Sequence, residues 1–97
     1  MSADDLQHRG WTFLSNHAHV LLCLTRDSTM RIRDIALEVG ITERAIRNII
    51  SDLEETGYVE RVRIGRRNSY RIDKSLHLRH PIEQRKTIAD LIRAIHD

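Results

Sequence analysis

A single glycine lies between two short segments of regular apolar spacing, and this arrangement limits the possible folds more than any other feature. Residues 31–39 and residues 43–56 both repeat apolar side chains every three or four positions, a spacing that predicts helices. Gly40 can adopt the left-handed conformation that ends a helix without steric cost. The Thr42 hydroxyl can then cap the first free amides of the next helix. We therefore expect two helices joined by a tight turn.

The side chains near this glycine fit two helices that cross closely. Ala36 is small at the expected crossing point, and Ile46 can fill the angle between the helices, as in a helix-turn-helix. The apolar positions of the second helix share one face, which leaves a polar face turned to solvent. That polar face consists of Arg44, Arg47, Asn48 and Ser51. We expect this helix to project from the domain with its polar face uncovered.

Two alternating, β-branched segments follow at residues 58–64 and 69–73, with the turn-forming sequence GRRN between them. This pattern predicts a β-hairpin. In the register that we expect, residues 66–68 form a three-residue loop with Asn68 left-handed, and Ile64 pairs with Tyr70. The apolar residues then share one face, and the other face holds the arginines Arg61, Arg63 and Arg71. Residues 61–71 contain five arginines and no carboxylate, so the hairpin is strongly cationic.

The flanking segments complete a mainly α fold. The apolar spacing of residues 11–26 predicts a first helix that is buried on more than one side. Residues 81–97 are expected to form a last helix with a proline in its first turn, after a linker at residues 74–80. Residues 1–10 are expected to be a flexible tail. The sequence thus predicts a domain over residues 11–73 with a three-helix core and a two-stranded β-hairpin wing, followed by an extra C-terminal helix.

The polar groups of the second helix of the turn and of the hairpin suit double-stranded DNA. An α-helix fits the major groove, where Arg can bond guanine O6 and N7 and Asn can bond adenine N6 and N7. Arg47 and Asn48 are the strongest candidates for base contacts, and Thr42, at the exposed helix N-terminus, for a phosphate contact. The chain has fourteen arginines and two lysines, which favours bidentate contacts to phosphate or guanine. The hairpin residues expected at the DNA backbone or the minor groove are Arg61, Arg63, Arg66, Arg67 and Asn68.

The stretch IRDIALEVGITERAIRNIISDLEETGYVERVRIGRRNSYRI resembles the MarR-like group of prokaryotic winged helix-turn-helix regulators, and the resemblance covers about residues 12–72. It implies a homodimer that regulates transcription, with one helix of each copy in successive major grooves and the wings over the flanking minor grooves. Such a dimer would act as a repressor by blocking polymerase at a promoter. Members of that group usually carry longer terminal helices that build a small-molecule pocket. The flanks here are shorter, so the resemblance leaves an effector open. The implied contacts are Arg44, Arg47, Asn48 and Ser51 in the groove, and Arg66 and Arg67 on the wing.

Apolar residues near both ends of the chain have two interpretations. The C-terminal stripe could cover the domain's own core or dock on a second copy of the chain, and the linker before it favours docking. The first helix offers a matching apolar surface. The residues expected at the dimer contact are Trp11, Phe13, Leu14, Ile88, Leu91, Ile92 and Ile95.

Other functions have less support in the sequence. Winged helices also serve as protein-interaction modules, in which a basic hairpin would be only a solvated surface. A metal-gated repressor would need ligands such as His19 with Cys23, or His77 with His80. Cys23 lies in an apolar run, however, and the second pair has no acidic neighbour. We expect no metal, no cofactor and no enzymatic activity, because neither a phosphate-binding glycine loop nor a nucleophile motif is present.

The expected compartment is the cytoplasm. A single cysteine cannot form an internal disulfide, and no apolar run approaches the roughly 20 residues that cross a bilayer. The first ten residues lack the charged-then-apolar order of a signal peptide. We therefore expect neither membrane insertion nor export.

Overall fold

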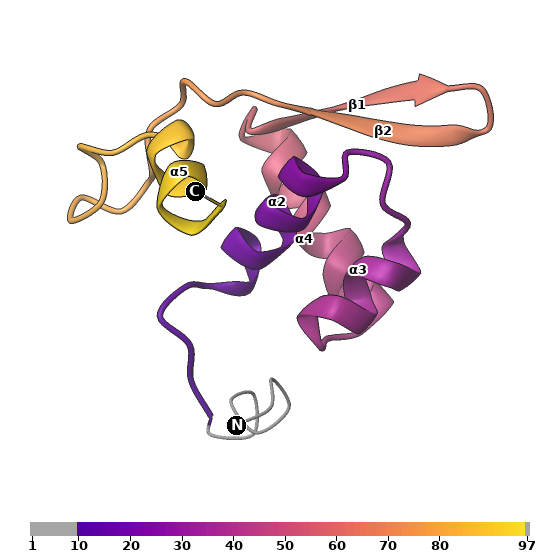
Figure 1. The fold of residues 1–97 in the computed structure, drawn as a ribbon, viewed down its shortest axis with the longest axis horizontal. Helices are drawn as coiled ribbons and strands as arrows, with labels where there is room; N and C mark the ends of the chain where they lie inside the picture. The colour runs from indigo at the N-terminus through magenta and orange to yellow at the C-terminus, as the bar shows by residue number, and fades with distance from the viewer. Residues whose placement is uncertain (1–9, 97) are drawn as a thin grey trace.

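A computed structural model describes residues 10–96, which form four helices and one antiparallel hairpin (Figure 1). In chain order the elements are α2 (Asn16–Arg26), α3 (Ile32–Val39), α4 (Glu43–Glu55), β1 (Val59–Ile64), β2 (Arg67–Ile72) and α5 (Ile88–His96). The hairpin lies along the top of the helices with its loop at the right, and α5 lies at the left. This confirms the predicted fold, mainly helical with a two-stranded wing. The tail predicted over residues 1–10 lies, apart from Gly10, outside the described residues.

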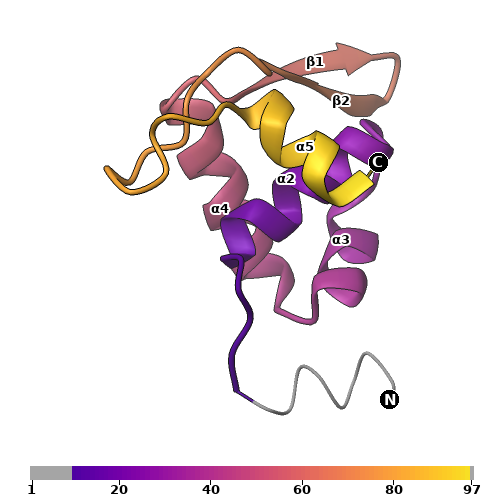
Figure 2. The same ribbon diagram turned by 60° about the vertical axis from the view of Figure 1, so that its left-hand side comes forward.

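One apolar core joins the helices to the base of the hairpin. Five consecutive residues of α2, from Val20 to Leu24, are buried, so this helix is covered on more than one side, as expected. Figure 2 shows α2 between α4 and α5. Ile35 of α3 and Ile46 of α4 are fully buried, and Tyr70 closes the core under the hairpin. No helix within residues 10–96 has the length and apolarity needed to cross a bilayer.

Local capping sets the bounds of the helix-turn-helix. Gly40 has a φ of 86°, and its amide donates a hydrogen bond to the Ala36 carbonyl at 2.8 Å, which closes α3. The Thr42 hydroxyl accepts a hydrogen bond from the Ala45 amide at 3.1 Å and so begins α4. Ala36 and Ile46 are both buried, as two closely packed helices require. The predicted glycine turn and N-cap are confirmed.

The first helix begins five residues later than its apolar spacing predicts. Residues 11–15 form an irregular arm, and the Ser15 hydroxyl caps α2 by accepting from the Ala18 amide at 3.2 Å. The Thr12 hydroxyl donates to the Leu14 carbonyl, a local bond of the kind that competes with helical pairing. The arm therefore shares the apolar spacing of the helix without its conformation.

The hairpin has a shorter loop than predicted. Gly65 and Arg66 alone form the turn, Gly65 has a φ of 61°, and Ile64 pairs with Arg67. The φ of Asn68 is not positive, so the predicted three-residue loop is wrong. A glycine in the first place of a two-residue turn follows the twist of the strands without a Cβ clash, and this preference outweighs the sorting of apolar residues onto one face. Val59, Tyr70 and Ile72 face the core in this register, whereas Val62 and Ile64 face outward.

The last helix also begins later than predicted. Residues 74–87 fold back on themselves in a loop that one β-bridge closes. The Thr87 hydroxyl accepts from the Asp90 amide at 3.3 Å, and the Asp90 carboxylate accepts from the Thr87 amide at 2.9 Å. This reciprocal cap starts α5 at Ile88. The predicted linker and the helical turn predicted at Pro81 are therefore both parts of the loop.

Candidate nucleic-acid interface

The outward side of α4 is uncovered. Its exposed residues include all four predicted groove contacts, Arg44, Arg47, Asn48 and Ser51. The opposite side carries the buried residues Ile46, Ile49, Ile50 and Leu53. Because the two sets lie on opposite sides of one helix, the core holds α4 while its hydrogen-bond donors point to solvent.

The arginines on this side of α4 are weakly held. Arg47 Nη2 lies 3.4 Å from Glu43 Oε1, with 62% and 48% of the two side chains exposed, so the pair adds little stability. The Arg44 guanidinium has no hydrogen bond or ion pair within residues 10–96. Both groups can therefore turn to an anionic partner without the loss of a strong internal contact.

Thr42 serves as the N-cap of α4 and remains exposed. Its hydroxyl oxygen accepts from the Ala45 amide, which leaves the hydroxyl proton free to donate. A phosphate at this helix end would meet that proton and the positive end of the helix dipole. The capping role and the predicted phosphate contact are thus compatible.

Arg61 lies at the junction of the hairpin and α4. Its Nη2 donates to Glu54 Oε1 at 2.9 Å. Its guanidinium also lies 6.0 Å from the centre of the ring of Tyr70, its partner across the hairpin, within the range of a cation–π contact. Arg61 therefore connects the base of the hairpin to the end of α4, a role that its sequence position alone did not indicate.

The arginines nearer the loop differ in their contacts. Arg67 Nη2 donates to the Thr29 carbonyl at 3.1 Å, and Arg63 Nε donates to the Gly65 carbonyl at 3.3 Å. The Arg66 side chain, in the turn itself, is exposed and makes no hydrogen bond within residues 10–96. Asn68 is exposed as well. Of the predicted wing arginines, Arg66 is therefore the freest to contact a ligand.

The loop between α2 and α3 anchors β2. The Tyr70 amide donates to the Ser28 carbonyl at 3.0 Å. In the same loop the Asp27 carboxylate accepts from the Thr29 amide and hydroxyl, and these bonds, with the nearby Arg67 charge, hold the pKa of Asp27 below its usual value. The hairpin is thus joined to the helical core both at its base and along its second strand.

Two arginines next to this anchor were not predicted as contact residues. Arg31 is the N-cap residue of α3, makes no side-chain capping bond, and is exposed, as is Arg33 in the first turn. Positive charge is unfavourable at a helix N-terminus, so these residues do not serve the helix that carries them. That mismatch is visible in the sequence and is the signal that would have marked them as further candidate phosphate contacts.

The residues predicted at a dimer contact are divided between the core and the surface. Ile88 is 3% exposed and belongs to the core, and Ile92 packs against that core. Ile88 therefore covers the chain's own interior, which corrects its assignment to a dimer surface, whereas Ile92 is only half-buried and its assignment stays a prediction. The exposed members of the set are Trp11, Phe13 and Ile95, at 67%, 92% and 50%.

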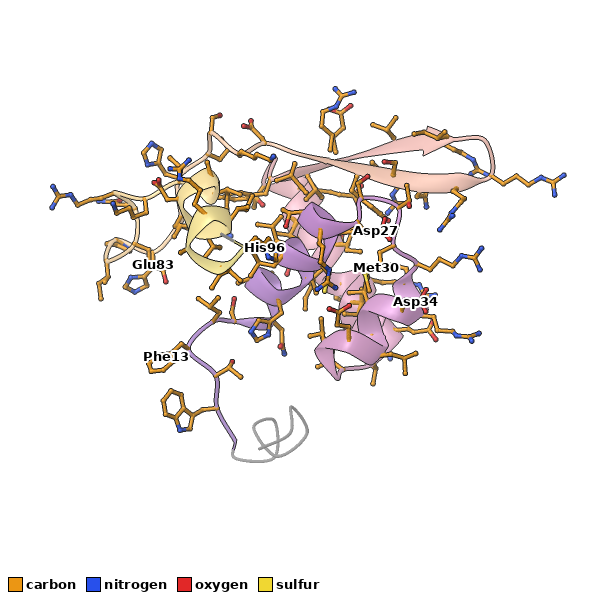
Figure 3. All side chains as sticks on the ribbon, in the orientation of Figure 1. Phe13, Asp27, Met30, Asp34, Glu83 and His96 are labelled. Atoms are coloured by element: carbon orange, nitrogen blue, oxygen red, sulfur yellow. The ribbon has the colours of Figure 1, made fainter. Side chains whose placement is uncertain are left out.

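An apolar groove of about 460 Å³ lies beside the arm. It runs between α2, the end of α4, the loop after the hairpin and α5, and we call it the arm groove. The Phe13 ring meets the Trp11 ring edge to face at 5.0 Å, and Figure 3 shows Phe13 pointing away from the helices. At the rim, the His17 ring lies 2.8 Å from the Asp52 carboxylate. Apolar residues that line the arm groove include Phe13, Leu14, Leu21, Leu53 and Leu91.

The histidines considered as metal ligands have other contacts. His19 Nδ1 lies 3.2 Å from Asn16 Oδ1, and His77 Nδ1 lies 2.8 Å from the Gln84 carbonyl. Burial raises the pKa of the Cys23 thiol, which disfavours the thiolate that a metal would need. Within residues 10–96 no three His, Cys, Asp or Glu side chains come together in a way that could hold a metal ion.

Comparison with protein-family models finds a match. A family model described as a domain of unknown function (DUF7343) matches residues 13–72, which include the helix-turn-helix and the whole hairpin. No curated protein matches the chain. The matched segment ends where β2 ends, so the loop after the hairpin and α5 lie beyond it.

Proposed function

The chain belongs to the DUF7343 family, whose description assigns no activity, and we propose from its geometry that it binds double-stranded DNA in a sequence-specific manner. In this proposal α4 enters the major groove, and the hairpin contacts the backbone or the minor groove beside it. Arg44, Arg47 and Asn48 read base edges, and Thr42 and Arg66 contact phosphates.

One observation carries the proposal. The side of α4 that bears Arg44, Arg47 and Asn48 is exposed. The end of α4 is bonded through Glu54 to a hairpin whose loop projects beyond the helices with further arginines (Figure 1). A helix of this width fits the major groove, about 12 Å wide, and the residue types match guanine and adenine edges. The two arginines of this face are available for such contacts, because Arg44 makes no ion pair within residues 10–96 and Arg47 has only a long, exposed pair with Glu43.

We propose further that the protein acts as a homodimer that regulates transcription, as the resemblance to MarR-like regulators implies. A two-fold dimer would place two copies of α4 in successive major grooves. Binding at a promoter would block polymerase, so repression is the simplest mechanism, and it would take place in the cytoplasm, where a prokaryotic chromosome lies. The exposed arm and the arm groove offer one apolar surface for the second copy, and Ile95 of α5 is exposed as well.

The test is a selection of binding sites from random duplexes, followed by titration of variants on the selected site. Arg47→Ala should cost about 1–3 kcal/mol of binding free energy and relax the preference at one base pair. Arg85→Ala is the matched control, because it removes the same charge from an exposed residue of the loop after the hairpin. It should leave both affinity and preference nearly unchanged.

Two results would contradict the proposal. If the selection returned no enriched sequence, recognition of bases by α4 would be excluded. If Arg47→Ala and Arg85→Ala weakened binding by the same factor, and did so on random as well as selected duplexes, Arg47 would contribute only its charge and would not read a base.

The second candidate is a protein-interaction module. The observation in its favour is the exposed Trp11–Phe13 pair beside an open apolar groove, a surface that suits a protein partner. This reading predicts duplex binding that is weak at physiological salt and indifferent to sequence, so the same selection separates the two.

A further inference from the structure

The hairpin carries an exposed aliphatic side chain beside its loop. Ile64 ends β1 and is 63% exposed. It pairs with Arg67 and lies on the face of the hairpin opposite to that of Tyr70. Nothing lies within 4 Å of the position that a Cβ would occupy at the neighbouring Gly65. Ile64 is therefore uncovered at the end of the hairpin that projects beyond the helices (Figure 1).

The charges around Ile64 limit what it can contact. Arg63 precedes it, Arg66 follows two residues later, and Arg67 pairs with it across the hairpin. An apolar protein groove would have to accept three guanidinium groups as well, which costs desolvation. The minor groove of DNA instead carries negative potential that attracts arginine, and proteins that bind there insert apolar side chains between base steps.

The dimensions of the loop agree with such a contact. The hairpin with its side chains is wider than the minor groove, which is about 6 Å wide, but its turn has only two residues, so a side chain beside the turn can enter the groove. Because Gly65 adds no side chain to the turn, Ile64 and Arg66 are the first groups that an approaching duplex meets. The Arg67 contact with the Thr29 carbonyl at 3.1 Å holds this end of the hairpin against the α2–α3 loop.

Resting on the DNA binding proposed above, we infer that Ile64 enters the minor groove as an apolar wedge that partly unstacks one base step and bends the bound DNA. The Arg66 guanidinium pairs with an adjacent phosphate, and the Ile64 side chain inserts between two stacked bases. Because pyrimidine–purine steps unstack most easily, the wedge makes the protein select such a step outside the segment that α4 reads. Specificity would then extend to base pairs that no polar side chain touches.

The test uses the full chain and a duplex from the selection, labelled at both ends with a donor and an acceptor dye. Wild-type protein should shorten the distance between the dyes and make a thymine in the flanking step reactive to permanganate, which oxidises unstacked thymines. Ile64→Thr keeps a β-branched side chain but replaces the apolar end with a hydroxyl. It should abolish the permanganate signal, reduce the bend, and lower affinity on the order of three- to tenfold, with the salt dependence of binding unchanged.

Three comparisons separate the possible causes. Ile64→Val should retain the signal, because it keeps an apolar side chain, and Ile82→Thr is the control at another isoleucine, 86% exposed in a loop away from the hairpin. Arg66→Ala should weaken the salt dependence and leave the bend largely intact. Normal binding with no thymine reactivity in wild type, or full reactivity in Ile64→Thr, would overturn the wedge while leaving DNA binding in place. Failure of wild type to bind any duplex would instead remove the proposed function itself.

Discussion

Arginines of the hairpin differ in the groups that their guanidiniums contact. Arg61 bonds to Glu54 and lies over Tyr70, and Arg67 bonds to the Thr29 carbonyl, whereas the Arg66 side chain makes no such contact within residues 10–96. The same residue type therefore stabilises the fold at one position and is free to bind a ligand at another. This division cannot be derived from charge counts along the segment, because it depends on which neighbour lies within reach in three dimensions.

The two kinds of arginine should separate in experiment. We expect Arg61→Ala to lower the free energy of unfolding by about 1 kcal/mol, since it loses an exposed ion pair and a ring contact. Arg66→Ala should leave stability within about 0.5 kcal/mol and reduce the slope of log K against log salt by about 1. Urea unfolding and DNA titration at several salt concentrations measure both effects. Equal stability losses in the two variants would show that the contacts of Arg61 contribute nothing.

Among the helices and strands, the bounds that depend on residues close together in the sequence were predicted best. The start of α4 was predicted correctly because the cap at Thr42 and the apolar spacing lie within one turn of each other. The predicted hairpin register was wrong because a three-residue loop at residues 66–68 and a two-residue turn at Gly65 and Arg66 lie within the same GRRN sequence. The positive φ of Gly65 belongs to the two-residue turn. The start of α5 was wrong because residues 74–87 pair with each other, and apolar periodicity does not report such pairing.

The cap of α5 makes a testable contribution to stability. Thr87→Ala should cost about 1 kcal/mol of unfolding free energy, as loss of an N-cap hydroxyl usually does. Hydrogen bonding by the Thr87 amide holds the pKa of Asp90 below its usual value. A depressed pKa gives stability that is present above the unfolded value, about 3.9, and lost as the pH falls through the folded value. Asp90→Asn should therefore be less stable than wild type at pH 7, with the difference shrinking in acid. A difference that stays constant down to pH 3 would contradict the role of the carboxylate.

At the scale of the whole molecule, burial decides which apolar residues remain for a partner. Ile88 lies in the core and the half-buried Ile92 packs against it, so α5 packs on the domain. The arm ahead of α2 keeps Trp11 and Phe13 exposed next to the arm groove. An exposed projection and an apolar groove on one side of the same chain suit a self-complementary two-fold contact.

A single charge on the arm should test this contact. Phe13→Asp should change the mass in light scattering from twice 11.4 kDa to 11.4 kDa, because a carboxylate cannot be buried unpaired in an apolar groove. Since Phe13 is 92% exposed, the fold should persist, with unchanged helical circular dichroism. Leu37→Asp, at a residue of α3 that is 75% exposed, should leave the mass unchanged. A wild-type mass of 11.4 kDa at micromolar concentration would contradict the dimer.

The hydrogen bond from the Tyr70 amide to the Ser28 carbonyl, with the Arg67 contact to Thr29, ties β2 to the loop that precedes α3. In the proposed complex with DNA, α4 and the hairpin would hold one mutual angle before binding, so little conformational entropy would be lost on association. If α4 and the hairpin keep a fixed angle, binding should weaken when the rotation of the DNA between the major-groove and minor-groove contacts changes. One base pair inserted between the two contacts would rotate the minor-groove site by about a tenth of a turn relative to the major-groove site. The fixed angle between α4 and the hairpin would prevent the protein from making both contacts.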